Sequence, residues 1–454
     1  MIALSLSQCA RPLQAELYGE DVSFSAVSTD TRNLAAGDLF VALKGPRFDG
    51  HAYLQQARER GAVAAMVSDA PATGMPSLLL QDTRVGLGRL AALWRERSAV
   101  PLIGVTGSNG KTTVKEMIAA ILGQRHRVLA TRGNLNNNIG LPLTLLRLQA
   151  HDCAVVEMGA NHSGEIGYLS RIAQPDVALL INAGRAHLEG FGSLRGVAEA
   201  KCEIIDGLKP GGCFIFNNDD PWAPLWRRRA AGLRTLGFGC GEGAEIRSPA
   251  QSLHLHWREG CFFSRFQVVT PAGENEIELA LAGAHNRMNA LAAIAAAQQL
   301  GAGWEEIRAG LAAIRPVPGR LQPLAGQVGC GVIDDSYNAN PDSVVAAVDV
   351  LASAPGRRYL VLGELREMGA GGGDLYRELG EYAHRSGIEG LLTLGDPVAT
   401  AAAAFGTGGE HYATLDALLE RLAGLLQAGD QVLVKGSRAA AMERVVKSLT
   451  GEVV

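Results

Sequence analysis

Residues 102–122 constrain the fold of this chain most strongly, because a strand, a glycine-rich loop and a helix follow one another there without a break. The apolar residues of 102–105 predict a short buried strand, and apolar residues recur at helical spacing over 114–122. The loop between them reads Thr106-Gly107-Ser108-Asn109-Gly110-Lys111-Thr112-Thr113. A strand, a glycine loop with a lysine and a hydroxyl, and then a helix is the arrangement of a phosphate-binding loop. The sequence therefore predicts an α/β domain at this point.

The chemistry of this loop favours a nucleoside triphosphate as its ligand. Loop N–H groups and the positive end of the helix face an anion, Lys111 can reach the terminal phosphates, and the Thr112 hydroxyl can ligate magnesium. The general P-loop has a glycine where this chain has Val105, so a tight glycine turn without a ligand is the alternative. A lysine has little structural purpose in such a turn. We therefore expect nucleotide contacts from Gly107, Ser108, Asn109, Gly110, Lys111, Thr112 and Thr113.

Length and composition limit the classes of protein to be considered. At 454 residues the chain exceeds one ordinary core and predicts about two to four domains. The formal net charge of -4 offers no basic field for nucleic acid or an anionic membrane. No apolar run reaches the roughly 18 residues that span a bilayer, and the N-terminus lacks a secretory pattern. We expect a cytoplasmic protein without nucleic-acid partners or membrane insertion.

The cysteines argue against disulfides and against a zinc site. Seven cysteines are present, an odd number, and they are widely spaced with no Cys-x-x-Cys pair. We interpret most of them as small core residues in a reducing compartment.

Changes in pattern predict three α/β domains, at residues 1–85, 86–315 and 316–454. A helix-like segment at 86–99 leads into the strand before the loop, and the Pro/Gly-rich segment 315–321 marks the second boundary. The N-terminal domain is expected to be small, with strands at 40–43 and 62–67 and a helix at 52–60. In the C-terminal domain, strands at 332–335, 359–363, 391–395 and 431–436 alternate with helical patterns, which predicts a Rossmann-like fold.

The central domain is expected to hold a mostly parallel sheet with helices on both faces. Strands are predicted at 153–158, 177–182 and 213–216, and an antiparallel patch at 240–282. Ligands gather beyond the carboxyl ends of such strands. Glu157 ends one strand, His187 follows the next, and Lys201 lies in a helical pattern. Each has a structural interpretation at least as good as the functional one, and only their convergence near the loop favours function.

Two further polar groupings are ambiguous. Asn286 and Asn289 lie three residues apart, so that both amides share one face of the first turn of an alanine-rich helix. Helix capping explains one asparagine readily and two less readily. In the N-terminal domain, the polar clusters at 28–32 and 44–51 could hold a phosphate or a sugar, or could be solvated turns.

In order and spacing, these motifs resemble those of the Mur ligases over nearly the whole chain; only residues of about 220–280 lack a recognised motif. The shared segments are Thr106–Thr113, Glu157–Ala160, Ala186–Glu189, His285–Asn289, Pro318–Arg320 and Asp335–Asn340. Four other segments are most similar to the family members that add D-alanyl-D-alanine, namely Thr31-Arg32, Gly133–Asn137, Val361–Glu364 and Val434–Arg438.

The resemblance implies an ATP-dependent ligase of peptidoglycan precursor synthesis. ATP would phosphorylate the carboxylate of UDP-N-acetylmuramoyl-tripeptide, giving an acyl phosphate and ADP. The amine of D-alanyl-D-alanine would then attack, and phosphate would leave. Because the triphosphate and the carboxylate are both anions, cations must neutralise them as they approach. A monomer with these small-molecule partners is expected.

The resemblance also implies roles for the residues around the loop. Lys111 would hold the transferring phosphate, and Thr112 with Glu157 would bind one magnesium ion. His187 would bind a second magnesium ion together with Lys201, because the matching lysine of the family is carbamylated and so carries a carboxylate.

The remaining implied roles concern the nucleotide and the two substrates. Asn286, Asn289 and Arg320 would contact the nucleotide, with Arg320 reaching the γ-phosphate. Asp335 would steady the ribose or the Lys111 region, and Asn338 and Asn340 would line the adenine pocket. For the substrates, the implied contacts are Thr31, Arg32 and Lys44 to UDP, Asn136 and Asn137 to the muramoyl part, and Lys435, Ser437 or Arg438 to the carboxylate of the dipeptide.

Three rival interpretations are less consistent with the sequence. The Mur ligase that adds a single diamino acid carries an Asp-Asn-Pro-Arg motif, which this chain lacks. Folylpolyglutamate synthetases share the nucleotide motifs but lack a UDP-binding N-terminal domain of this type. A nucleotide-binding regulatory module without ligation chemistry would have no reason to keep Glu157, His187, Lys201 and Arg320 together.

Overall fold

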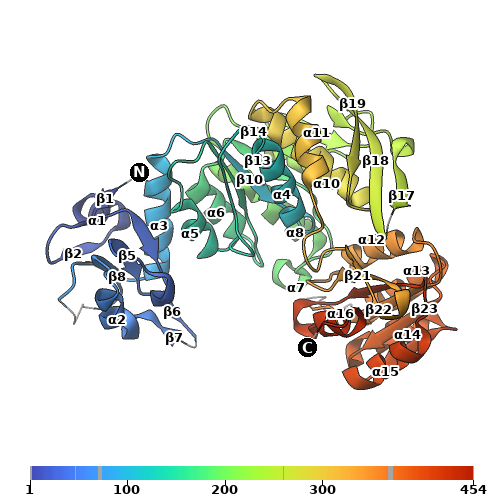
Figure 1. The fold of residues 1–454 in the computed structure, drawn as a ribbon. Coiled ribbons are helices and arrows are strands. Elements are labelled where there is room, and N and C mark those ends of the chain that lie inside the picture. Colours follow the sequence, from blue (N-terminus) through green and yellow to red (C-terminus); the bar gives the residue numbers. More distant parts are fainter. Residues whose placement is uncertain (1–2, 47, 70–73, 259, 367–371, 453–454) are drawn as a thin grey trace.

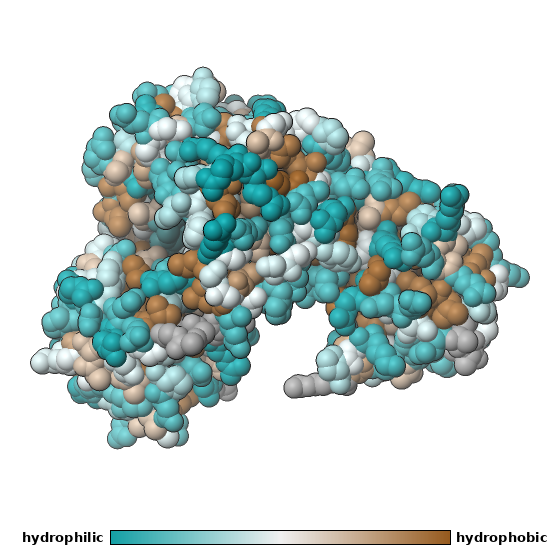
Figure 2. All heavy atoms as spheres, turned by 180° about the vertical axis from the view of Figure 1, so that it is seen from behind, coloured by the Kyte–Doolittle hydropathy of each residue, from teal (hydrophilic) through white to brown (hydrophobic). Residues whose placement is uncertain are grey.

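The computed structural model describes residues 3–46, 48–69, 74–258, 260–366 and 372–452. Three α/β domains follow one another and form an arch, with the N-terminal and C-terminal domains at its two ends (Figure 1). The space-filling view shows the open notch between these end domains (Figure 2). The predicted fold class is therefore confirmed. Within the described ranges, no helix has the length and apolar character needed to cross a bilayer.

The N-terminal domain is built on a five-stranded sheet of order β2-β9-β8-β5-β4, in which only the β2 pairing is antiparallel. Two short antiparallel pairs, β1 with β3 and β6 with β7, lie beside it. The bounds are β1 Leu4–Ser5, α1 Leu6–Leu13, β2 Glu16–Tyr18, β3 Ser23–Phe24, β4 Ala26–Ser28, β5 Asp38–Val41, β6 Lys44–Gly45, β7 Phe48–Asp49, α2 Leu54–Glu59, β8 Ala64–Val67 and β9 Ser77–Leu79.

The central domain holds a ten-stranded sheet of order β11-β12-β10-β13-β14-β15-β16-β18-β17, with β19 paired to β18. The strands from β11 to β16 are parallel, and β16, β17, β18 and β19 pair through antiparallel ladders. The strand bounds are β10 Leu102–Thr106, β11 Val128–Ala130, β12 Cys153–Glu157, β13 Val177–Leu180, β14 Cys213–Asn217, β15 Arg234–Gly239, β16 Ile246–Arg247, β17 His254–Arg258, β18 Cys261–Thr270 and β19 Gly273–Leu279.

Helices cover both faces of this sheet, as the unbroken apolar runs of its strands require. One face packs against α4, α10 and α11, and the opposite face packs against α3, α5, α6, α8 and α9. The bounds are α3 Thr83–Glu96, α4 Lys111–Leu122, α5 Gly140–Leu145, α6 Glu165–Ala173, α7 Leu188–Phe191, α8 Leu194–Cys202, α9 Ala223–Arg229, α10 Ala284–Gln299 and α11 Trp304–Ala313.

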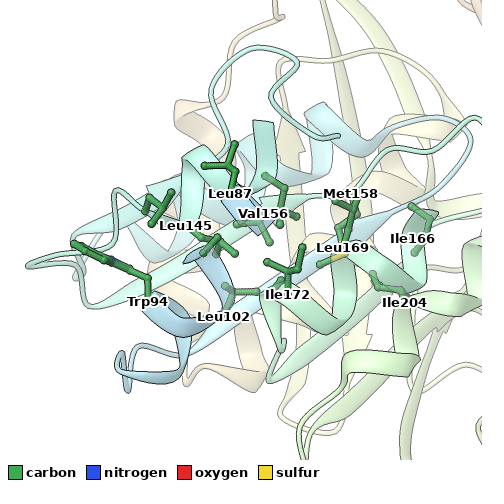
Figure 3. Packing of buried hydrophobic residues seen from close by; sticks show 14 of the residues in the cluster. Leu87, Trp94, Leu102, Leu145, Val156, Met158, Ile166, Leu169, Ile172 and Ile204 are labelled. Atoms are coloured by element: carbon green, nitrogen blue, oxygen red, sulfur yellow. The ribbon is translucent and has the colours of Figure 1, made fainter. Parts of the chain in front are cut away.

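Helix α3 joins the cores of the first two domains. Its side chains Leu87 and Trp94 belong to the same core cluster as Leu169 and Ile172 of α6 (Figure 3). The same cluster includes Leu4 and other residues of the N-terminal domain. The predicted boundary near residue 85 therefore falls within a helix that packs against both the N-terminal and the central domain.

The C-terminal domain has a six-stranded sheet of order β20-β21-β25-β22-β23-β24, parallel except for the pairing of β20. Helices α12, α13 and α14 pack on one face, and α15 and α16 on the other. The bounds are β20 Gln322–Ala325, β21 Gly331–Asp335, α12 Pro341–Ala352, β22 Arg358–Gly363, α13 Gly372–Arg385, β23 Gly390–Leu394, α14 Ala399–Phe405, β24 Gly409–Tyr412, α15 Leu415–Leu425, β25 Gln431–Lys435 and α16 Glu443–Thr450.

Candidate active site

A cleft of about 1510 Å³ runs between the central and C-terminal domains and extends to the start of α3. Its walls include the phosphate-binding loop, the carboxyl ends of β12 and β13, the first turn of α10 and the segments that follow β21 and β25. These are the strand ends at which ligands gather in parallel sheets. The cleft is therefore the candidate active site.

The loop after β10 is shaped by glycine at its last position before the helix. Gly110 has a φ of 84°, in the left-handed region, and α4 begins at the next residue. A side chain at Gly110 would also collide with the amide of Asn289, which lies against the loop. Asn286 accepts a hydrogen bond from Asn289 (3.0 Å) and donates one to the carbonyl of Ala282 (2.8 Å). Both asparagines line the cleft.

Lys111 folds back over this loop. Its ammonium donates hydrogen bonds to the carbonyl oxygens of Gly107 (2.7 Å) and Ser108 (3.4 Å). Burial lowers the pKa of Lys111; Glu157 opposes this shift and the charge of Arg320 adds to it. The ammonium is therefore undercompensated, and a terminal phosphate would be a better counter-ion than two carbonyls.

Thr112 and Glu157 meet because β10 and β12 are adjacent parallel strands. The Thr112 hydroxyl donates to Glu157 Oε2 (3.0 Å), and the amide of Asn136 donates to Glu157 Oε1 (2.8 Å). Arg320, from the start of the C-terminal domain, donates to the Thr112 hydroxyl (3.2 Å). A hydroxyl and a carboxylate within hydrogen-bond distance are suitable magnesium ligands, and substrate phosphates normally complete such a site.

His187 and Lys201 both contact the aromatic ring of Phe191. His187 packs edge-on against Phe191 with ring centroids 6.5 Å apart, and the Lys201 ammonium lies 5.3 Å from the same ring. His187 lines the cleft, whereas Lys201 is buried behind its wall and is only 1% exposed. Burial, and then the charge of Lys111, lower the pKa of Lys201 to about 7, against the attraction of Glu165 and Glu203.

No ready-made metal site of three or more His, Cys, Asp or Glu side chains occurs within the described residues. The predicted ligands Thr112, Glu157, His187 and Lys201 include only one carboxylate and one imidazole, and they stay a prediction.

In the C-terminal domain, Asp335 is held by Lys435. The Lys435 ammonium lies 2.5 Å from Asp335 Oδ2 and donates to the carbonyl of Asn338 (3.0 Å), while the N–H of Leu321 donates to Asp335 Oδ1 (3.1 Å). Burial raises the pKa of Asp335, against the attraction of Lys435. Lys435 therefore braces this wall of the cleft through two of its three ammonium donors, and it also lines the cleft.

Ser437 and Arg438 remain available at the same end of the cleft. The Ser437 hydroxyl is buried and makes no hydrogen bond in the described part of the chain. Arg438 lies 3.5 Å from Glu443 and 6.0 Å from the ring of Tyr337. The guanidinium of Arg320 lies 4.4 Å from the centre of the same ring, so Tyr337 contacts both arginines.

The predicted UDP contacts lie outside the walls of the main cleft. Thr31 donates to Gln56 (2.8 Å), the exposed Arg32 pairs with Asp30 (2.7 Å), and Lys44 lies 3.4 Å from Asp49. The cleft reaches this region instead through Asp82, Arg84 and Val85.

Arg84 and Asn137 line the end of the cleft that is nearest the N-terminal domain, and both make hydrogen bonds to the backbone. Arg84 donates to the carbonyl of Lys44 (3.1 Å), so the cleft ends next to the predicted UDP loop. Asn137 accepts from the N–H groups of Ile139 and Gly140 at the start of α5 and lines the same cleft. The sequence reasoning missed Arg84, whose position after the Asp82 helix cap was the available signal.

Asparagines link the phosphate-binding loop to its neighbours. The Asn182 side chain accepts from the N–H of Asn109 (2.9 Å) and donates to its carbonyl (3.1 Å). The Asn109 amide in turn accepts a hydrogen bond from Asn340 (2.7 Å), which also caps α12 by accepting from the Ser343 N–H. Asn338 and Asn340 both line the cleft. The role of Asn182 was missed, although its place at the end of a predicted strand pointed to it.

Family models match most of the chain in three consecutive segments. Residues 23–95 match the model described as Mur ligase family, catalytic domain; residues 105–297 match the Mur ligase middle domain; and residues 319–438 match the Mur ligase, glutamate ligase domain.

Individual relatives agree with these models along the whole chain. The UDP-N-acetylmuramoyl-tripeptide--D-alanyl-D-alanine ligase of Escherichia coli strain K12 is 46% identical, with 99% of each chain covered. A crystal structure of MurF from Acinetobacter baumannii superposes with a TM-score of 0.93 at 34% identity, and each chain is fully covered (100%). A MurF ligase of Thermotoga maritima in complex with ADP superposes with a TM-score of 0.84 at 30% identity, over 94% of this chain and 97% of that one.

Proposed function

This chain belongs to the Mur ligase family, and we infer from that membership that it joins D-alanyl-D-alanine to UDP-N-acetylmuramoyl-tripeptide at the expense of ATP. The product is a precursor of peptidoglycan. The full-length relatives that carry this activity in their names support the assignment. The observation that carries it is the contact of Arg320 with Thr112, because it brings the C-terminal domain onto the phosphate-binding loop.

The residues of the cleft account for the first chemical step. Lys111 and Arg320 would neutralise oxygens of the γ-phosphoryl group, which lets the tripeptide carboxylate approach and form an acyl phosphate with release of ADP. The glycine loop and the start of α4 would hold the β-phosphate. Asn286 and Asn289 would fix the nucleotide from the opposite wall, and Tyr337 would keep the guanidinium of Arg320 in place.

Two magnesium ions are part of the proposal. Thr112 and Glu157 would hold one, and His187 with a carbamylated Lys201 would hold the other. Magnesium, when bound, would neutralise the phosphate charge and polarise the phosphoryl group. A buried lysine whose pKa is lowered to about 7 is about half uncharged amine at pH 7, and the uncharged amine is the form that reacts with CO₂.

The second step needs the dipeptide beside the acyl phosphate. The amine attacks the acyl carbon, a proton leaves the nitrogen, and phosphate departs with the former carboxylate oxygen. We assign the dipeptide carboxylate to Ser437 and Arg438. The buried Ser437 hydroxyl lacks a partner among the described residues, and Arg438 supplies the positive charge. Lys435 stays a third candidate, because Asp335 and Asn338 take two of its three ammonium donors.

The other assignments remain part of the proposal. Asp335 would steady the nucleotide side of the cleft through Lys435, and Asn338 and Asn340 would face the adenine. Asn136 would act through Glu157, and Asn137 would lie nearer the muramoyl sugar. Thr31, Arg32 and Lys44 would reach UDP where Arg84 ends the cleft. We also propose domain boundaries near residues 85 and 315, a cytoplasmic monomer, and no nucleic-acid partner.

Phosphate release by the purified protein tests this function. The reaction contains ATP, magnesium and UDP-N-acetylmuramoyl-tripeptide, with D-alanyl-D-alanine, diaminopimelate or glutamate offered in separate assays. We expect release with the dipeptide only. Release with diaminopimelate or glutamate, and not with the dipeptide, would refute the assignment. Identical release without any UDP substrate would point to a simple ATPase.

A further inference from the structure

We propose that Asp342 of the C-terminal domain is a positioning residue that fixes the loop carrying His187 whenever this domain docks on the central domain. The loop comprises residues 182–187, between β13 and α7. The proposal rests on the proposed function in one respect: it takes His187 to be part of the ATP-magnesium site.

The first half of this loop is held within the central domain. The N–H of Ala183 donates to Asp220 (3.0 Å), and the N–H of Gly184 donates to the Ser108 hydroxyl (2.9 Å). That hydroxyl donates back to the Gly184 carbonyl (3.2 Å). The path of the chain is therefore fixed up to residue 184 by the central domain alone.

The second half is held by the C-terminal domain. The N–H of Arg185 donates to Asp342 Oδ2 (2.6 Å), and its Nε donates to Oδ1 of the same carboxylate (2.7 Å). A second carboxylate, Glu378 of α13, lies 3.1 Å from Arg185 Nη1. The Arg185 and Asp342 side chains are 28% and 35% exposed, so the pair is only partly open to screening by solvent. Charge-assisted bonds of this kind define position more sharply than neutral ones.

Two local features of the loop fit the close approach of Asp342. A side chain at Gly184 would collide with the Asp342 carboxylate. Two residues after the contact, His187 has a φ of 55°, in the left-handed region that non-glycine residues rarely occupy. Such a conformation persists only where the surroundings impose it. Asp342 holds Arg185 from the other domain, two residues before His187.

Helix α12, which carries Asp342, is itself anchored to the central domain at several points. Its cap Asn340 pairs with Asn109 of the phosphate-binding loop. Farther along, Gly283 approaches Val350, and Phe262 of β18 is buried in the core cluster of the C-terminal domain. The strands β17 and β18 reach down to α12 and α13 in Figure 1. The segment that lacked a recognised motif thus provides an interdomain contact.

This arrangement couples docking to the completion of the active site. When the C-terminal domain is docked, Arg185 is held and His187 is presented to the cleft. When it is undocked, Arg185 loses Asp342 and Glu378, and His187 keeps its contacts within the central domain, such as the ring of Phe191, so the imidazole is held less precisely at the second metal position. ATP would then be used only in the docked enzyme.

Hydrogen exchange in the ligand-free protein tests the contact without relying on activity. In Asp342→Ala, we expect amides of the segment 183–190 to exchange about tenfold faster than in the wild type. Arg185→Ala should accelerate them about threefold, because the N–H of residue 185 can still reach Asp342. The matched control is Glu381→Gln, which alters the same type of charge on α13 but pairs with Arg385 away from the interface; it should leave the segment unchanged.

The result that overturns the proposal is unchanged exchange of 183–190 in both Asp342→Ala and Arg185→Ala. If Asp342→Ala also accelerates exchange in the strands of the C-terminal domain, that result indicates that this domain is loosened. In that case the exchange of 183–190 in Arg185→Ala is the deciding measurement, since this variant leaves the contacts within the C-terminal domain intact. These outcomes do not depend on the substrate of the enzyme, so they are distinct from a failure of the ligase assay.

Kinetics separate positioning from general structure. Asp342→Ala should lower kcat about tenfold and raise the magnesium concentration needed for half-maximal rate, with KM for the dipeptide unchanged. Arg185→Lys should have a higher kcat than Arg185→Ala, because the lysine ammonium can still reach the carboxylate of Asp342. A variant in which only the dipeptide KM rises would contradict the role that we assign to Asp342.

Discussion

Replacing Lys201 by methionine should stabilise the protein and abolish its activity. The side chain is 1% exposed, and its ammonium has the face of Phe191 as neighbour in place of a hydrogen-bonded carboxylate. Burial lowers its pKa from the ordinary 10.5 to about 7. Each tenfold change in the protonation constant is about 1.4 kcal/mol, so the buried amine costs about 4 kcal/mol at pH 7. After about 1 kcal/mol for repacking, Lys201→Met should gain about 3 kcal/mol.

The pH dependence of this gain has a definite sign. A lysine with a depressed pKa in the folded state opposes folding most strongly at and below pH 7, where the unfolded chain binds the extra proton. As the pH rises from about 7 towards 10.5, the unfolded amine also loses its proton, and the cost disappears. The advantage of Lys201→Met over the wild type should therefore shrink by about 1.4 kcal/mol per pH unit above pH 7.

Urea unfolding in CO₂-free buffer at several pH values measures this effect. The matched control is Lys115→Met, because Lys115 is also buried but donates to the carbonyl of Thr131 (2.9 Å) and pairs with Glu116. Losing those partners should destabilise the control by about 1–3 kcal/mol. A Lys201→Met variant that is less stable than the wild type, or whose advantage does not change with pH, would refute the reasoning.

Three further outcomes are expected. Lys435→Met leaves Asp335 as an uncompensated buried carboxylate and should lower the free energy of unfolding, measured in urea, by about 3–5 kcal/mol. An unchanged free energy of unfolding would show that the ion pair does not stabilise the domain. Ser437→Ala should raise KM for D-alanyl-D-alanine about tenfold and leave KM for ATP alone, and equal changes in both would exclude a dipeptide contact. With ¹³C-bicarbonate, a carbamate resonance from Lys201 should appear as the pH rises through about 7 and be lost below it, whereas a resonance that persists in Lys201→Met would exclude this site.

The sequence was sufficient to predict the fold where apolar runs are fully buried. The strands predicted at 153–158 and 177–182 are β12 and β13, and the antiparallel patch at 240–282 is β16 to β19. The strand predicted at 40–43 instead begins at Asp38, because a buried carboxylate there accepts the N–H of Ala35 (2.9 Å). Edge strands such as β24 were missed because they are short and partly exposed, so no apolar run marks them.

Contacts at the candidate site follow from sequence patterns alone only within one domain, whereas the roles of Arg320 and Asp335 were implied by the family resemblance. The contact of Thr112 with Glu157 follows from two adjacent parallel strands, in which Val105 pairs with Glu157. By contrast, Arg185 and Asp342 are 157 residues apart and meet across two domains, and no pattern in either segment indicates the other. The UDP contacts of the N-terminal domain stay predictions.

The central claim is that the tripeptide carboxylate is activated as an acyl phosphate before D-alanyl-D-alanine attacks it. The most direct measurement uses UDP-N-acetylmuramoyl-tripeptide labelled with ¹⁸O in its terminal carboxylate, with mass analysis of the released phosphate. The account predicts that the label appears in inorganic phosphate, with unlabelled ADP and a ligated pentapeptide product. Unlabelled phosphate, or label in AMP, would contradict it.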